Sequence, residues 1–286
     1  MSVFRLAVLI IAVSLLSACS AIKLAYNQAP DLSYWWLDGY FDFNEQQTPI
    51  VREELSKLFA WHRSNELPKT AQLLSQAAQL MPGEVSLQQA CALYSQGRGL
   101  IDNITNQALP YLADMAPTLT TEQIAHLKRK YAKNADEFSR NYIKGSAASI
   151  EAKRVKQAVD RSEMIYGKLE EAQIAAVKKE VNSSAFDAAF SLKERQRRQQ
   201  ELIDILTNLA VTKANSQNSQ QAIRSYIQRA WESPDLAYRA YSQRLTQQAC
   251  QSFANVHAST TAAQRANAVK VLKGYETDMR TLSASR

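Results

Sequence analysis

The side chains that most often carry catalytic or metal chemistry are few in this sequence and are not spaced for it. His62, His126 and His257 are the three histidines. None of them stands in a His-Glu-x-x-His or Glu-x-x-His pattern, the helical spacings that build zinc and di-iron sites. The adjacent carboxylates at 53–54 and 170–171 would point in different directions on a helix and would not form a hydrolase pair. We therefore expect no catalytic residue, no metal site and no bound cofactor.

Cys19 lies where a covalent modification is expected. Arg5 precedes an apolar run over residues 6–16 that is too short to span ~30 Å of hydrocarbon and is typical of a secretion signal. The run ends in Leu-Ser-Ala-Cys at 16–19, which resembles the lipobox of bacterial lipoproteins. The resemblance implies cleavage before Cys19 and acyl chains on it, and Ser20 in the next position favours the periplasmic face of the outer membrane. The alternative is an ordinary signal peptide with an incidental cysteine.

Cys91 and Cys250 are the two remaining cysteines. In the oxidising periplasm that the lipobox resemblance implies, two cysteines predict one disulfide. The alternative is that both are small core residues, because Cys91 lies on an apolar helical stripe and Cys250 stands three residues before Phe253. The sequence leaves this choice open.

One folded region is expected behind the leader. We predict a signal peptide over residues 1–18, a lipidated tether over 19–30 and an all-α domain over 31–286, with a sub-boundary near 145–150. The 46% apolar content excludes a disordered chain, and the net charge of +7 makes the protein basic. The implied compartment holds anionic lipid and peptidoglycan carboxylates. We therefore expect the membrane, envelope proteins, anionic lipid or peptidoglycan as partners, and no nucleic acid.

Helical periodicity dominates the rest of the sequence. Only seven glycines and seven prolines interrupt it, and no segment shows the sustained alternation of a strand. The predicted fold class is therefore all-α, a multi-helix bundle or array of roughly nine to eleven helices with no β-sheet. The expected helices cover residues 44–65, 68–80, 85–115, 120–144, 150–166, 170–181, 184–213, 217–231, 235–256 and 261–282.

Six aromatic side chains fall within residues 34–43, close to the expected lipid. They could seat the domain on the bilayer, since aromatic residues favour the membrane interface. They could instead close the core where the chain enters the fold. We favour the core, because folded domains usually bury Trp and Phe.

A weak internal repeat marks three expected helix starts. Segments 43–47, 119–123 and 169–173 each place an apolar residue, a cap or acidic residue and a glutamine at the same spacing. The capping box, a reciprocal pair of hydrogen bonds at a helix start, accounts for this pattern. The middle copy, Leu-Thr-Thr-Glu-Gln, is also similar to the motif of the periplasmic LTxxQ chaperones, small helical cradles that hold unfolded clients.

A broader resemblance covers most of the chain after the lipobox. It is carried by Leu-Ala-Tyr-Asn-Gln at 24–28, Tyr-Trp-Trp-Leu-Asp at 34–38, Phe-Asp-Phe at 41–43 and Trp-His-Arg at 61–63. These segments look like a family of uncharacterised Gram-negative lipoproteins, a domain of unknown function. The resemblance implies a lipid anchor and a helical fold, and it implies no activity.

A polar run over residues 193–201 contains no apolar side chain. Because such a run cannot belong to a core, we expect an exposed cationic helix face for an anionic envelope partner. Its cations are Lys193, Arg195, Arg197 and Arg198. Two glutamates in the run are spaced to pair with two of these arginines, which leaves a surplus of about two charges. The alternative is an ordinary solvated face.

These features predict an outer-membrane-anchored periplasmic lipoprotein that acts without catalysis, as an interaction or client-binding module. The alternative is an enzyme that acts on peptidoglycan with two carboxylates drawn from distant helices. A deep polar cleft with paired acids would favour the enzyme. A concave apolar face would favour the binding module.

Overall fold

Every regular element in the described part of the chain is a helix. The structure is a computed structural model that describes residues 22–285. Eleven α-helices and one 3₁₀ turn have their bounds in this part, which holds no strand, so the predicted all-α class is confirmed. In chain order they are α2 (Ala29–Phe41), α3 (Gln47–Asn65), α4 (Leu67–Leu80), α5 (Leu87–Met115), η1 (Ala116–Thr118), α6 (Thr121–Tyr142), α7 (Ala147–Tyr166), α8 (Glu171–Ser183), α9 (Ala188–Thr212), α10 (Ser216–Trp231), α11 (Leu236–Ala258) and α12 (Ala262–Ala284).

The amino-terminal part departs from the expectation. Residues 22–27 are helical and α2 follows almost at once, where the sequence predicts a tether and no helix. The hydroxyl of Tyr26 is 2.8 Å from Nδ1 of His62 on α3, and Lys23 pairs with Asp278 of α12 at 3.5 Å. The described part of the predicted tether is therefore packed onto the domain.

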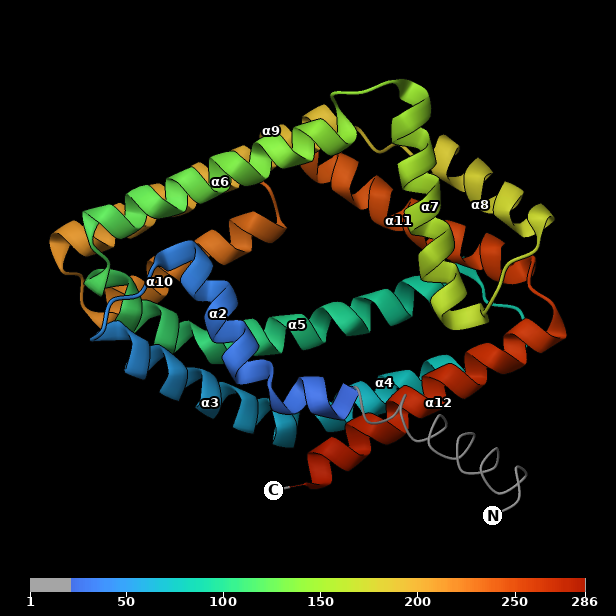
Figure 1. Ribbon diagram of the computed structural model, residues 1–286, viewed down its shortest axis with the longest axis horizontal. Helices are drawn as coiled ribbons and strands as arrows, with labels where there is room; N and C mark the ends of the chain where they lie inside the picture. Colours follow the sequence, from blue (N-terminus) through green and yellow to red (C-terminus); the bar gives the residue numbers. More distant parts are fainter. Residues whose placement is uncertain (1–21, 286) are drawn as a thin grey trace, which may run out of the picture.

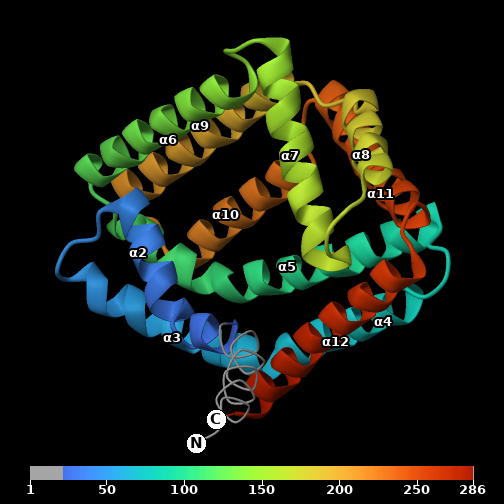
Figure 2. The same cartoon turned by 45° about the vertical axis from the view of Figure 1, so that its right-hand side comes forward.

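The helices form a frame whose edges are pairs of helices (Figures 1 and 2). α6 runs beside α9 along one edge, and α4 runs beside α12 along another. α2 packs on α3, while α8 contacts both α7 and α11. α5, with 29 residues, crosses the frame and contacts α4, α10 and α11. Helices that are distant in sequence therefore lie side by side.

Three groups of buried apolar side chains hold the frame together. The first lies among α4, α5, α7, α8, α11 and α12 and includes Met81. The second lies among α5, α6, α9 and α10 and includes Leu127 and Leu206, and a small third group around Tyr34 packs α2 on α3. Each of the two larger groups draws residues from before and after 145–150, so the expected sub-boundary there does not divide the core.

The structure joins Cys91 of α5 to Cys250 of α11 in a disulfide. Their Cα atoms are 5.3 Å apart, which lies within the range that disulfides require, and the two residues are separated by 159 positions in the sequence. Both cysteines belong to the first apolar group. The bond therefore ties the crossing helix α5 to one side of the frame.

The glutamines of the internal repeat meet in the interior. Gln47, which begins α3, and Gln123, near the start of α6, each donate from Nε2 to the other's Oε1, at 3.2 and 2.6 Å. Each Oε1 also accepts the backbone N–H of the residue three positions earlier, Asn44 or Thr120. Each Nε2 also donates to a backbone carbonyl of the opposite segment. The pair therefore fastens two helix starts to each other.

A second pair repeats this arrangement at another corner of the frame. Gln173 of α8 and Gln264 of α12 exchange hydrogen bonds of 2.7 and 2.8 Å. Gln264 closes a capping box with Thr261, so the spacing of cap residue and glutamine recurs at residues 261–264. Here Thr260 stands where the three segments of the repeat have an apolar residue.

Candidate functional site

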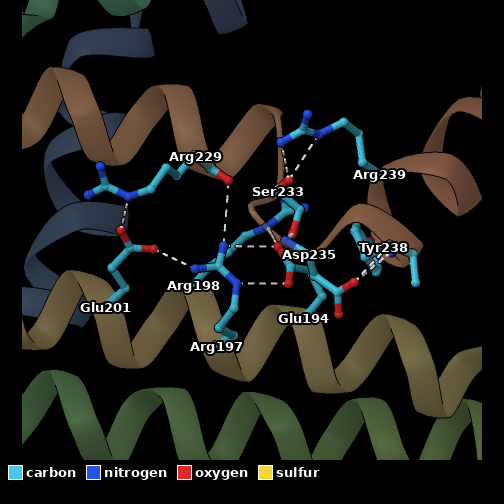
Figure 3. A network of polar contacts seen from close by, with 10 residues as sticks. Glu194, Arg197, Arg198, Glu201, Arg229, Ser233, Asp235, Tyr238 and Arg239 are labelled. Carbon is cyan, nitrogen blue, oxygen red and sulfur yellow. Dashed lines mark hydrogen bonds and ion pairs between the residues drawn. The ribbon is translucent and has the colours of Figure 1, made fainter.

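The polar run of α9 contains a buried carboxylate. Glu194 is only 4% exposed and accepts hydrogen bonds from Arg197 (Nε, 2.8 Å) and Arg198 (Nε, 2.9 Å). Arg197 also donates to Glu201 at 2.6 Å, one turn further along. Figure 3 shows these side chains between α9 and the helix opposite it. The charges of the run are therefore largely paired with one another.

The network continues from α9 to α10 and α11. Arg229, in the last turn of α10, donates from Nε to Glu201, and Arg197 reaches the carbonyl of Arg229 at 3.5 Å (Figure 3). In the link to α11, Arg239 donates twice to the carbonyl of Ser233, at 3.0 and 2.9 Å. The polar stretch of α9 thus joins α9 to α10 through residues that are 28 and 32 positions apart in the sequence.

Both glutamates of the network hold their negative charge. Burial alone would raise the pKa of Glu194, but hydrogen bonds from Arg197 and Arg198 outweigh it and the pKa is lowered. Burial would also raise the pKa of Glu201, but hydrogen bonds from Arg229 and Arg197 outweigh it, and this pKa is lowered as well. A carboxyl whose pKa is lowered is ionised at neutral pH and is unsuited to donate a proton.

The predicted exposed cationic face on α9 is therefore wrong for half of its residues. Arg197 and Arg198 are half-buried and both form ion pairs with Glu194, while Lys193 and Arg195 are exposed. The two pairs expected at i, i+4 spacing are present, but the burial of Glu194 was not expected. A run without apolar side chains can be buried because each desolvated charge here has an oppositely charged partner.

A shallow groove of about 620 Å³ runs beside this network between α9 and α10. Its carboxylates are Glu201 and Asp204. Glu201 is bound to two arginines, and Asp204 accepts a hydrogen bond from Gln200 at 2.7 Å. The groove therefore offers no pair of free acids of the kind that a glycoside hydrolase uses.

A second hollow, of about 680 Å³, lies where faces of α6 and α7 meet. Arg154 and Arg161 line it from α7, and Arg195 lines it from α9. The guanidinium of Arg195 lies over the ring of Phe138 at 4.6 Å, and that of Arg154 lies over Phe186 at 5.0 Å. The two α7 arginines were not among the predicted site residues, although their spacing of seven residues places them on one helix face.

α2 presents a large apolar surface to solvent. Tyr34 is buried, as the core interpretation of residues 34–43 expects, but Trp35 is 62% exposed and Trp36 is 63% exposed. Leu32, three residues before Trp35, is exposed as well. The core interpretation is wrong for both tryptophans, because α3 covers only the side of α2 that carries Tyr34. We call Leu32, Trp35 and Trp36 the α2 face.

The remaining candidate residues lie apart from these surfaces. His257 is fully buried, with Nε2 2.8 Å from the carbonyl of Gly83 and Nδ1 2.9 Å from the hydroxyl of Tyr166. Within residues 22–285 no three His, Cys, Asp or Glu side chains cluster as metal ligands. No helix of that region combines the length and apolar character needed to cross a membrane. Cys19 lies outside the described residues.

The fold and these sites define a class: an all-α protein with internally paired buried charges, an arginine-lined hollow and an uncovered aromatic helix face. Residues 39–234 match a family of unknown function, DUF6279. Because the match covers more than half of the chain, the protein belongs to this family, as the resemblance to an uncharacterised family predicts. The match ends before α11. No curated protein and no solved structure matches the chain.

Proposed function

We propose that this protein is a lipoprotein of the outer membrane, anchored by Cys19 on the periplasmic side, that acts as a non-catalytic binding module against the bilayer. The observation that carries the proposal is the α2 face, an uncovered apolar surface that follows soon after the expected lipid. Large exposed apolar patches mark interaction or membrane surfaces. Because the α2 face lies close in the chain to the expected lipid on Cys19, we propose that it contacts a lipid surface.

The composition of the α2 face suits a membrane interface. Leu32, Trp35 and Trp36 are spaced i, i+3 and i+4, so they project from one side of the helix. Tryptophan prefers the headgroup region, where its ring is partly apolar and its N–H stays polar. The guanidinium of Arg52 lies 5.2 Å from the ring of Trp35 and pairs with Asp31, so the charge beside the α2 face is balanced and the tryptophans carry the argument.

The reach of the chain is compatible with this placement. Cys19 precedes Leu32 by 13 residues. Because residues 22–27 and 29–32 are helical, that length spans at most ~25 Å, so a lipid on Cys19 would hold the α2 face near the bilayer surface. Acyl chains give the affinity, and the aromatic face would orient the domain.

The absence of catalysis is supported by the state of the acids. Among the described residues, every carboxyl group with a resolved pKa shift has its pKa lowered, by cations or by hydrogen bonds. A glycosidase needs one acid whose pKa is raised, to protonate the leaving group. Glu137 is the only carboxylate lining the hollow between α6 and α7. These observations favour binding over hydrolysis.

Replacing Cys19 by alanine is expected to remove the protein from the membrane fraction, because the residue that would carry the acyl chains is lost. Fractionation and the size of the product measure this. The matched control is the Cys91→Ser/Cys250→Ser chain, which keeps Cys19 and should stay in the membrane. A Cys19→Ala chain that remains processed and membrane-bound would contradict the anchor.

The orientation on the bilayer has its own test. The chain has four tryptophans, and in vesicles of brominated lipid we expect the two at 35 and 36 to account for most of the fluorescence quenching. The Trp35→Phe/Trp36→Phe variant should therefore lose it. The control Trp61→Phe/Trp231→Phe removes the same number of indoles elsewhere and should keep it. Equal quenching in the two variants would show that the α2 face does not touch lipid.

A further inference from the structure

We infer that the hollow between α6 and α7 binds an anionic sugar, a carbohydrate that carries carboxylate or phosphate groups. The inference deepens the proposed binding function, and it names a ligand class for a site that lies on the other side of α9 from the paired network. It rests on three features of the hollow: its unbalanced charge, its aromatic rings and its amide side chains.

The charge of the hollow is unbalanced. Arg154, Arg161 and Arg195 line it, and Glu137 is the one acidic residue among the lining side chains. Within the described residues, neither Arg161 nor Arg195 forms a hydrogen bond or ion pair, in contrast to Arg197 on the same helix as Arg195. Guanidinium groups without acidic partners at a partly enclosed surface favour carboxylate or phosphate ligands.

Aromatic rings flank these cations. Phe138 and Tyr142 of α6 pack with their centroids 5.0 Å apart, and Phe186 meets Tyr142 edge-on at 6.2 Å. Two of the rings already carry the guanidinium groups of Arg195 and Arg154 on their faces. A sugar ring offers apolar C–H groups that pack on such rings and hydroxyls that stay polar, so it matches a lining of mixed character.

The amide groups argue against an acyl chain as the occupant. Asn134, Asn141 and Gln157 also line the hollow. Gln157 exchanges hydrogen bonds with the hydroxyl of Tyr142, at 3.2 and 3.0 Å. A hydrocarbon chain here would cover the guanidinium groups of Arg161 and Arg195 without supplying an acceptor, which is costly. Sugar hydroxyls, carboxylates and phosphates can accept from guanidinium groups, and sugar hydroxyls can also donate to amide oxygens.

The test titrates the full chain, purified in detergent, with defined probes. The first is the disaccharide-tetrapeptide released from peptidoglycan, which carries carboxylates. The second is the same fragment with its carboxylates amidated, and the third is the deacylated, phosphorylated glucosamine disaccharide of lipopolysaccharide. Binding of the first or third probe, weakened by salt and absent for the amidated fragment, supports the inference. Comparison of these two distinguishes a carboxylate source from a phosphate source.

The Arg161→Gln/Arg195→Gln variant should bind the preferred probe at least about tenfold more weakly, since each guanidinium would lose a charged hydrogen bond. Both side chains are exposed, so thermal unfolding should not change. Lys156→Gln/Lys193→Gln is the matched control, because it removes one exposed cation from each of the same two helices outside the hollow. An equal loss in this control, no binding by the unaltered chain, or equal binding of the amidated fragment would overturn the inference. The titration does not require the protein to be attached to a membrane. Its result is therefore independent of the fractionation test of the Cys19 anchor.

Discussion

The Cys91→Ser/Cys250→Ser chain is expected to unfold more easily than the natural chain, by up to about 5 kcal/mol in the free energy of unfolding. The physical reason is the length of the closed loop, 159 residues in sequence separation, because a cross-link of this length removes much conformational entropy from the unfolded chain. The double replacement avoids a stray reactive thiol. Urea unfolding of both chains under non-reducing conditions measures the difference.

A reducing agent supplies the control for this experiment. It should bring the natural chain to the stability of the double variant and leave the variant unchanged. Thiol labelling of the denatured, unreduced protein provides a direct count. Two reactive thiols in addition to any at Cys19 would show that Cys91 and Cys250 are not paired in the cell.

Gln123→Ala is expected to cost about 2–4 kcal/mol in the free energy of unfolding, more than loss of a helix cap alone. The amide of Gln123 accepts from the backbone N–H of Thr120 and donates to the carbonyl of Asp42 and to Gln47. Its removal leaves buried polar groups in two distant segments without partners. Gln264→Ala should have a similar effect, because Gln264 occupies the equivalent place in the second pair.

Gln89 provides a matched control. It closes a capping box with Ser86 at the start of α5 but is exposed and meets no second glutamine. Gln89→Ala should therefore cost less than about 1 kcal/mol, the usual value of a cap. Chemical unfolding of the variants at one protein concentration makes the comparison. Equal losses for Gln89→Ala and Gln123→Ala would show that the pairing of glutamines adds nothing beyond capping.

The helices were largely predictable because the interactions that begin and end them are local. Thr120 begins α6 through hydrogen bonds to a residue three positions away, and such bonds are readable in a sequence. Pro82 and Gly83 follow the end of α4 for equally local reasons. The helix α2 was the exception, because its cluster of aromatic residues says little about backbone conformation.

The sites were less predictable, because burial depends on which distant helix packs against each face. The same helix turn carries Tyr34, which is buried against α3, and Trp35, which is 62% exposed. On α9, Arg197 forms ion pairs within the network. Arg195, two residues earlier, lines the hollow together with the arginines of α7. A list of cations in the sequence cannot separate these two roles.

The sequence by itself therefore determined the helical class, most helix starts, the capping glutamines and the two cysteines available for pairing. Tertiary structure alone decided that the glutamines meet in pairs 76 and 91 residues apart. It also decided that Glu194 is buried and that an arginine-lined hollow opens between α6 and α7. The physical reason is the range of the interactions. Helix capping and helix termination by proline or glycine involve residues three or four positions apart. Burial and charge pairing depend on contacts between helices that no local pattern encodes.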